Sequence, residues 1–393
     1  MSDSLNYVDL FCGIGGFHLA LDKVNANCIL SCDTDKKCRE SYFVNFGMEP
    51  EGDVRKIDFS QIGNVDIICG GFPCQPFSNA GKKLTLSDDR GLLFDEIMKI
   101  AKMKNPKFLF LENVKHILKV GDGEVFKYIR AKINAHGYYL QLFQMSPHNY
   151  GIPQQRERIY FVCVRNDIYN GNDVCLKKES NIPIEFEKFL DKKEDINEKY
   201  YLKGDLLQVL EAWDEMIKEF AVDEKISPTI LVNEFYKTYT NKEFEDLALW
   251  RKDYITKNKP LYNKYKDKWD SWYTKYSDLL SKREVYCKLE WQVGPIKPND
   301  SIFNYFIQIR QSGIRVRRAQ YFPTLVAISQ IPIYGKEKRY ITPRECIRLQ
   351  SFPEDYSIDE NDRVVYKQAG NAVNVDNASN VILSTLSHYN YIE

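Results

Sequence analysis

Short apolar segments alternate with amphipathic ones from residue 6 to about residue 165, and this alternation restricts the possible folds more than any other feature. Buried strands are expected at 6–11, 28–33, 65–71, 107–113, 139–145 and 158–164. Helical periodicity occupies intervals such as 17–26 and 91–103. Strands that alternate with helices form a parallel sheet covered on both faces. We therefore predict an α/β fold with a mostly parallel sheet and helices on both faces.

The composition changes beyond about residue 170, where Lys, Glu, Asp, Tyr and Trp dominate. All five tryptophans lie in this part, which indicates a second, smaller core: Trp213, Trp250, Trp269, Trp272 and Trp291. Amphipathic helices are expected at 204–220 and 241–257. An arginine-rich, strand-like stretch covers 306–335, and a Gly-Asn turn at 370–371 should precede a final helix.

Overall composition excludes several classes of protein. Lys plus Arg and Asp plus Glu are both 55, so a polyanion would have to bind a local patch. The ten cysteines include no C-x-x-C pair, which argues against a zinc site with paired ligands and against a dense disulfide framework; we expect no metal. No apolar run reaches about 18 residues, and the N-terminus lacks signal-peptide features. We expect a soluble intracellular protein with no membrane association.

A glycine-rich turn made of Gly13, Gly15 and Gly16 follows the first expected strand and opens a helix. Free backbone N–H groups and the helix dipole favour an anionic ligand at such a turn, and glycine permits close approach. The pattern is not the dinucleotide fingerprint G-x-G-x-x-G, because the third glycine is replaced by His18. A nicotinamide or flavin cofactor is therefore disfavoured.

Two acidic residues extend this expected cofactor site. Asp33 ends the second strand, where a carboxylate can accept hydrogen bonds from a ribose. Asp53 follows the presumed third strand region and could reach an adenine amino group. The alternative is that the glycines only pack a tight turn.

A thiol, a carboxylate and two arginines follow or precede three different strands. Cys74 lies just beyond the strand at 65–71, and Glu112 ends the strand at 107–113. Arg156 and Arg158 come at the start of the strand at 158–164. Because open α/β sheets bind ligands at the carboxyl ends of their strands, we expect these groups to converge there.

These groups match the chemistry of cytosine methylation at C5. That carbon is a poor nucleophile until a thiolate adds to C6. A carboxyl group could stabilise or donate a proton at N3, and an arginine could hold O2. Positive neighbours or a proton acceptor must supply the thiolate, because a free thiol with a pKa of about 8.5 is mostly protonated at neutral pH.

Each group also has a structural alternative. Cys74 could be a buried structural residue, and Glu112 could cap the helix that follows it. Arg156 and Arg158 could form surface ion pairs that contribute little. Purely structural roles for the thiol, the carboxylate and the arginines together, at one sheet edge, are less probable than a structural role for any one of them.

The motifs resemble those of the DNA (cytosine-5)-methyltransferase family, of the bacterial restriction-modification type. The matching segments, in the order of the family, are DLFCGIGGFHLAL, GGFPCQPFSNAGK, FLENVKHI, QQRERIYFV, RECIRLQSFPEDY and YKQAGNAVNV. They cover roughly residues 6–165 and 315–376. The resemblance implies a Rossmann-like methyltransferase fold that uses S-adenosylmethionine, with an additional smaller target-recognition domain.

The resemblance also implies roles for individual residues. Cys74 would be the nucleophile, Glu112 the contact to N3 and Arg158 the contact to O2, with Arg156 supporting them. S-adenosylmethionine would lie against a set of residues from both ends of the chain, namely Phe11, Gly13, Gly15, Gly16, Asp33, Asp53, Pro73, Asn371 and Val373. The loop from Ser78 to Arg90 resembles the one that closes on DNA after the base is flipped out.

The family pattern divides the chain into four parts. Residues 1–175 would be the catalytic and cofactor-binding domain, 176–330 the target-recognition domain, 331–360 a hinge, and 361–393 a segment returning to the catalytic domain. Four arginines could read guanine edges or hold phosphates: Arg310, Arg315, Arg317 and Arg318. The alternative is a solvated, salt-bridged strand edge.

Two other functions remain open at this point. The chain could be a tRNA methyltransferase of the branch that shares these motifs, although it lacks that branch's Cys-Phe-Thr segment. It could also be a catalytically silent binder, although the thiol, the carboxylate and the arginines are all present. The expected partner is double-stranded DNA, with a restriction endonuclease as a possible genetic partner, and we expect a monomer. The expected location is the bacterial cytoplasm, or the nucleus or a viral factory in another host.

Overall fold

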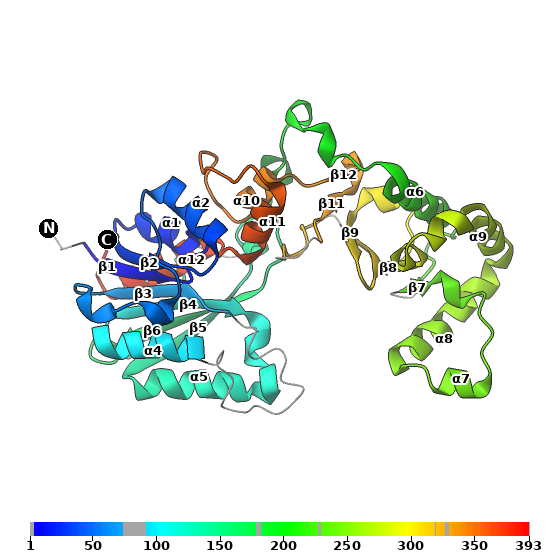
Figure 1. Cartoon of the computed structure of the whole chain (residues 1–393). Helices are drawn as coiled ribbons and strands as arrows, with labels where there is room; N and C mark the ends of the chain where they lie inside the picture. Colours follow the sequence, from blue (N-terminus) through cyan, green and yellow to red (C-terminus); the bar gives the residue numbers. More distant parts are fainter. Residues whose placement is uncertain are drawn as a thin grey trace. The chain divides into compact units, whose positions relative to one another are not determined.

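Two compact units make up the chain. The computed structural model describes residues 4–73, 92–177, 182–226, 229–318, 320–326 and 330–392. One unit comprises Met1–Phe189 with Pro343–Glu393, and the other comprises Leu190–Thr342 (Figure 1). The segment predicted as a hinge, 331–360, is shared: its residues to 342 belong to the second unit and the rest to the first. Its role, and that of the target-recognition part, stay predictions.

The first unit is built on a six-stranded sheet in the order β2-β1-β3-β4-β6-β5. Its strands are β1 Asn6–Leu10, β2 Asn27–Cys32, β3 Ile67–Gly71, β4 Phe108–Val114, β5 Tyr138–Met145 and β6 Arg158–Arg165. The pairings among β1, β2, β3 and β4 are parallel, whereas β6 is antiparallel to both of its neighbours. All six predicted strands, and the mostly parallel sheet, are confirmed.

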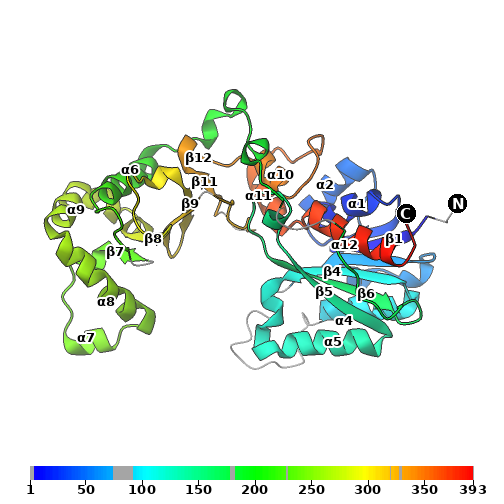
Figure 2. The same cartoon turned by 180° about the vertical axis from the view of Figure 1, so that it is seen from behind.

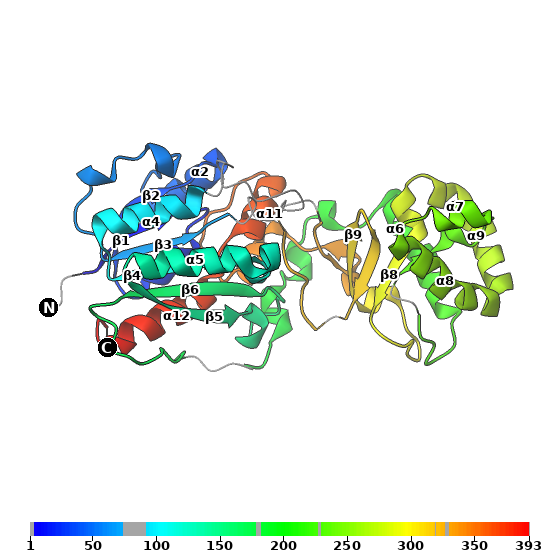
Figure 3. The ribbon, with the colours of Figure 1, turned by 90° about the horizontal axis from the view of Figure 1, so that it is seen from below.

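Alternating side chains bury both faces of this sheet. Ile68 and Leu109 pack on one side against α4 Leu92–Lys104 and α5 Glu124–Ala135. Ile67 and Phe108 point to the other side, against α1 Gly16–Asp22 and α12 Val375–His388. Figure 3 shows α4 and α5 on one side of the sheet and α12 on the other. A strand exposes successive side chains to opposite faces, so apolar runs on central strands require this double cover. Among the described residues, the remaining α-helices of the unit are α2 Lys36–Phe46, α10 Pro343–Leu349 and α11 Asp362–Asn371.

The C-terminal segment corrects one expectation. Gly370 and Asn371 do not form a turn but end helix α11, and the chain becomes extended from Ala372 onward to the start of the next helix. The next helix, α12, starts where Oδ1 of Asn374 accepts a hydrogen bond from the N–H of Asn377 at 3.0 Å. A side-chain cap of this kind satisfies an N–H that the first turn of a helix leaves unpaired. Helix α12 then packs beside α1, as Figure 2 shows.

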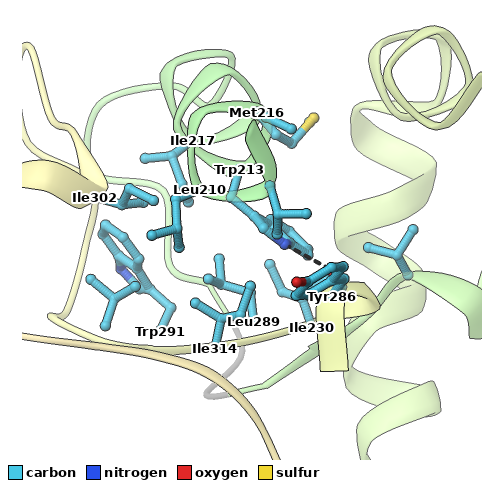
Figure 4. Packing of buried hydrophobic residues seen from close by; sticks show 14 of the residues in the cluster. Leu210, Trp213, Met216, Ile217, Ile230, Tyr286, Leu289, Trp291, Ile302 and Ile314 are labelled. Carbon is cyan, nitrogen blue, oxygen red and sulfur yellow. Dashed lines mark hydrogen bonds between the residues drawn. The ribbon is translucent and has the colours of Figure 1, made fainter. Parts of the chain in front are cut away.

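The second unit has its own sheet and core. Its strands, in the order β12-β11-β9-β10-β8-β7, are β7 Ile230–Leu231, β8 Lys288–Gln292, β9 Phe306–Arg310, β10 Gly313–Arg317, β11 Ile333–Tyr334 and β12 Arg339–Tyr340. Trp213, Leu289 and Ile314 meet in a buried cluster between this sheet and its helices (Figure 4). The Nε1 of Trp213 donates to the carbonyl of Tyr286 at 2.9 Å.

The helices of the second unit confirm one prediction and correct another. The expected helix at 204–220 is α6 Gly204–Lys218. The expected single helix at 241–257 is instead α7 Asn241–Glu245 and α8 Leu249–Lys264, followed by α9 Lys266–Ser281. Of the five tryptophans only Trp250, near the start of α8, is largely exposed, at 58%. None of the helices in the described ranges is both long and apolar enough to span a membrane.

Candidate active site

The turn after β1 is held in a left-handed conformation. The φ angles of Phe11, Gly13 and Gly15 are 56°, 54° and 85°. The N–H of Gly13 donates to Oδ2 of Asp33 at 2.9 Å, which ties the turn to the end of β2. A Cβ on Gly15 would lie 2.2 Å from the ring of Phe46. A side chain at this position is excluded by both the backbone angle and the space.

The returning C-terminal segment meets this turn. A Cβ on Gly16 would lie 2.5 Å from the carbonyl oxygen of Val373. At the end of β3, a Cβ on Gly71 would lie 3.3 Å from Cγ2 of Val373 and 3.4 Å from Oε2 of Glu112. Val373 is buried, whereas Asn371 is exposed. The structure therefore brings Gly16, Val373 and Glu112 together from distant parts of the sequence.

A pocket of about 240 Å³ opens beside the turn. Four of the residues predicted to bind the cofactor line it, namely Phe11, Asp33, Asp53 and Pro73. The lining also includes residues that the sequence did not single out: Cys32, Thr34, Gly52, Val54, Arg55 and Leu93. Thr34 and Gly52 could have been predicted as lining residues, because each is adjacent in the sequence to one of the two aspartates. Leu93 belongs to α4, and no local pattern connects it with the turn.

The two aspartates of the pocket differ in their environment. Asp33 accepts hydrogen bonds from the N–H groups of Gly13 and Asp35. Burial raises the pKa of Asp33, and these two hydrogen bonds oppose the shift. Asp53 is more exposed and is bound by the guanidinium of Arg55, with Nη2 at 2.6 Å from Oδ2. Hydrogen bonding to Arg55 lowers the pKa of Asp53.

Antiparallel pairing brings Glu112 and Arg158 together. Val114, near the end of β4, lies opposite Arg158 at the start of β6. The Nε of Arg158 is 2.8 Å from Oε1 of Glu112, and the two side chains are 13% and 11% exposed. Burial raises the pKa of Glu112, while the guanidinium groups of Arg158 and Arg156 oppose this. Glu112 therefore keeps its proton more readily than a solvated glutamate does.

Arg156 points to a different partner. Its Nη2 donates to the carbonyl oxygens of Gly370 and Ala372, each at 3.0 Å. It is 2% exposed, and burial lowers its pKa to about 9. The structure thus places Arg156 against the C-terminal segment, two residues from the arginine that pairs with Glu112.

The chain that leads to Cys74 is anchored beside Glu112. Nδ2 of Asn113 donates to the carbonyl of Phe72 at 2.9 Å, and Oδ1 of Asn113 accepts from the N–H of Val114 at 2.8 Å. Pro73 is the last described residue before a gap. Cys74, Ser78 and Arg90 lie outside the described residues.

The four predicted DNA-contacting arginines lie in the second unit. Arg310 ends β9, Arg315 and Arg317 lie on β10, and Arg318 follows β10. The Nε of Arg315 is 2.5 Å from Oε2 of Glu290, and the Nε of Arg318 donates to the carbonyl of Val293 at 2.7 Å. Within the part of the chain that the structure describes, no group of three or more acidic, histidine or cysteine side chains could hold a metal ion.

The fold and the pocket define an α/β enzyme of the Rossmann-like class with a site for a nucleoside-containing cofactor. The C-5 cytosine-specific DNA methylase family matches residues 5–387. Type II methyltransferase M.HhaI of Haemophilus parahaemolyticus is 29% identical over 369 residues, which cover 94% of this chain and 90% of that protein. Type II methyltransferase M1.ScrFI of Lactococcus lactis subsp. cremoris is 31% identical over 376 residues, or 94% of this chain and 74% of that one.

The solved structure of the Entamoeba histolytica methyltransferase EhMeth has the same fold, with a TM-score of 0.58 at 20% identity over 98% of this chain and 99% of that one. The chain belongs to the C-5 cytosine-specific DNA methylase family. It transfers a methyl group from S-adenosylmethionine to C5 of cytosine in DNA. The resemblance, the fold class and the cofactor predicted from the motifs are confirmed.

Proposed function

We propose that this enzyme is a DNA (cytosine-5-)-methyltransferase, EC 2.1.1.37, that modifies a flipped-out cytosine in a specific short duplex sequence through a bond between Cys74 and C6. The observation that carries the proposal is the buried pair of Glu112 and Arg158. This pair lies beside Gly71 and Phe72, the residues that lead into the segment of Cys74.

The residues of the chain divide the reaction among them. The thiolate of Cys74 adds to C6, and the electron pair of the C5–C6 double bond moves toward N3 through the ring. Glu112 holds the proton at N3, and Arg158 donates hydrogen bonds to O2 and stabilises the developing charge. S-adenosylmethionine, when bound, would supply an electrophilic methyl group to C5, and its sulfur would leave as a neutral thioether. A base then removes the C5 proton, and the returning electron pair expels the thiolate.

The pocket beside the first turn fits the cofactor. Asp33 offers a buried carboxylate to the ribose hydroxyls, and Asp53 can accept from the adenine amino group. Phe11, Pro73 and Leu93 provide apolar contact. The predicted contacts of Gly13, Gly15 and Gly16 are to the methionine end, because these glycines leave the backbone accessible. Asn371 and Val373 would close the site from the C-terminal side.

The protein must also expose its target base. A stacked cytosine offers no face to a thiol and a methyl donor together, so the base has to leave the duplex. We propose that Ser78 and Arg90 belong to the loop that closes over it. Arg310, Arg315, Arg317 and Arg318 would contact the DNA from the second unit.

The cellular context follows from the relatives. Those named above are Type II methyltransferases of bacteria. We propose that this enzyme acts in the bacterial cytoplasm and protects DNA against a restriction endonuclease encoded with it. One flipped base needs one site, so a monomer suffices.

One experiment tests the proposed function directly. The chain is expressed in a host that lacks DNA methylation, and 5-methylcytosine is mapped across the genome. We expect a short consensus with one modified cytosine, and no modification by the Cys74→Ala variant, which should still bind S-adenosylmethionine. Modification of tRNA alone, or methylation by Cys74→Ala, would contradict the proposal.

A further inference from the structure

One face of the sheet in the second unit gathers arginines. Ile314 and Val316 of β10 point into the core, so Arg315 and Arg317 point to the opposite face. The same alternation puts Arg310 of β9 on that face, because Ile307 and Ile309 pack against the core. On β8, Leu289 and Trp291 belong to the core and Glu290 to the arginine face.

This arginine face concentrates positive charge. On β8, β9 and β10 it carries Lys288, Arg310, Arg315 and Arg317 against a single carboxylate, Glu290. Burial, together with repulsion from Arg315 and Arg310, lowers the pKa of Arg317. The whole chain has balanced charge, so this is a local patch of the kind that binds a polyanion.

Within this face, Arg315 is held through its Nε by the carboxylate of Glu290. Its Nε lies 2.5 Å from Oε2 of Glu290, and Glu290 is on the neighbouring strand, directly opposite Arg315 in the register. The Glu290 side chain is 6% exposed and that of Arg315 is 24% exposed. Among the described residues, the two Nη groups of Arg315 have no hydrogen-bond partner. A guanidinium anchored at Nε presents both Nη groups outward as a rigid pair of donors.

Arg318 shows the contrasting arrangement. Its Nε donates to a backbone carbonyl, that of Val293, rather than to a carboxylate, and it follows the end of β10. A buried carboxylate holds a guanidinium more strongly than a neutral carbonyl does. Arg315 is therefore the better oriented of the two.

We propose that Arg315 reads one guanine of the target sequence in the major groove, and that Glu290 is the residue that positions it. This inference rests on the proposed function. The two Nη groups match O6 and N7 of guanine, which is the commonest specific contact of arginine with DNA. Glu290 orients the guanidinium before DNA binds, so less conformational entropy is lost on contact. A phosphate contact would need no such orientation and would carry no sequence information.

The first experiment compares methylation patterns in a methylation-deficient host. The wild type is expected to require guanine at a defined position of its consensus. Arg315→Gln should reduce discrimination against the other bases at that position by about ten- to a hundred-fold and leave the other positions unchanged. Arg315→Lys keeps the charge but loses the planar fork, and should also relax this position. Glu290→Gln should relax the same position by a smaller factor.

Arg283→Lys is the matched control, because Arg283 is exposed in the same unit, lies on none of the strands β8, β9 and β10, and stacks on Tyr286. Its methylation pattern should equal that of the wild type. An unchanged pattern in the Arg315 variants would overturn the inference while leaving the proposed function standing. A wild type that produces no 5-methylcytosine would instead contradict the proposed function.

A second experiment changes the DNA instead of the protein and then compares the salt dependence of Arg315→Gln. Binding of the wild-type enzyme is measured on duplexes in which each guanine of the consensus is replaced in turn by 7-deazaguanine, which lacks N7. We expect about a tenfold loss at one position only. Equal binding at every position, or a uniform loss with a lower salt dependence in Arg315→Gln, would assign Arg315 to a phosphate and overturn the inference.

Discussion

The Glu112–Arg158 pair of the first unit and the arginine face of the second unit place charged side chains in different environments. In the first unit, Glu112 and Arg158 form an ion pair whose side chains are each 13% exposed or less, and Arg156 is 2% exposed. In the second, the arginine face lies on a half-exposed sheet where Arg315 keeps donors available. Burial shifts the pKa of a group that must move or hold a proton, whereas base reading requires donors that DNA can reach. In the proposed function, this difference separates the residues for chemistry from the residues for recognition.

The largest expected effect tests the chemical side of this comparison. Glu112→Gln keeps the size of the side chain but cannot supply a proton in the same way. We expect the rate of methyl transfer in a single turnover to fall about 10²- to 10⁴-fold. Glu157→Gln, which changes an exposed carboxylate next to Arg158 in the sequence, is the control and should keep the wild-type rate.

Glu112→Gln should also differ from the wild type in how the rate of methyl transfer depends on pH. Burial raises the pKa of Glu112, so the wild-type group keeps its proton to a higher pH than a free glutamate and loses it as pH rises through the raised pKa. The rate of the wild type should fall along this limb, and the limb should be absent in Glu112→Gln. A pH profile identical in both proteins would assign the proton to another group.

A second prediction tests whether the units are energetically separate. Trp213 is fully buried in the core of the second unit, so Trp213→Ala should lower the free energy of unfolding by about 3–5 kcal/mol. Denaturant titration measures this, and calorimetry should find S-adenosylmethionine affinity within about twofold of the wild type. Trp250→Ala, at an exposed tryptophan, should change stability by about 0.5 kcal/mol or less. Loss of cofactor binding in Trp213→Ala would show that the units depend on each other.

A third prediction distinguishes the two neighbouring arginines of the first unit. Arg156→Met leaves two buried carbonyls, those of Gly370 and Ala372, without their donor, which costs about 1–3 kcal/mol. We expect a higher KM for S-adenosylmethionine with kcat nearly unchanged, whereas Arg158→Lys should mainly lower kcat. If Arg156→Met lowered kcat at saturating cofactor, Arg156 would act on the base instead.

The smallest effect is expected at the glycine turn. Gly16→Ala places a Cβ 2.5 Å from the carbonyl oxygen of Val373, so the C-terminal segment has to shift, at a cost of about 1–2 kcal/mol. Cofactor affinity should fall roughly tenfold. Gly63→Ala, which meets nothing within 4 Å, is the matched control. Equal affinity in both variants would separate Val373 from the cofactor site.

Local patterns predicted much of the first unit. Each expected strand is a short apolar run, and all six form because a doubly covered sheet needs such runs. Glu112 and Arg158 were expected to converge, but their contact depends on β6 running antiparallel to β4, which apolar content does not reveal. Arg156 was expected beside Glu112 and Arg158 because it lies two residues before Arg158 in the sequence. Its actual partners are 214 and 216 residues away, beyond the reach of any local pattern.

The second unit was harder to predict. Helical periodicity continues across residues 246–248, so one helix was expected where α7 and α8 form. Thr240 and Glu243 cap α7 reciprocally at its start, and the helix then ends after little more than one turn. The arginines were recognised as a group, but only the strand register shows that Glu290 is opposite Arg315.

The contact between Gly16 and Val373 has a consequence for how the enzyme is made. A ribosome translates the glycine turn before the arginine face, and the segment that closes on the turn after it. In the proposed site, a nascent chain therefore lacks the Val373 side of the cofactor site until after the residues of the arginine face have been translated. The order of synthesis would thus delay cofactor binding until the residues proposed to select the target are present.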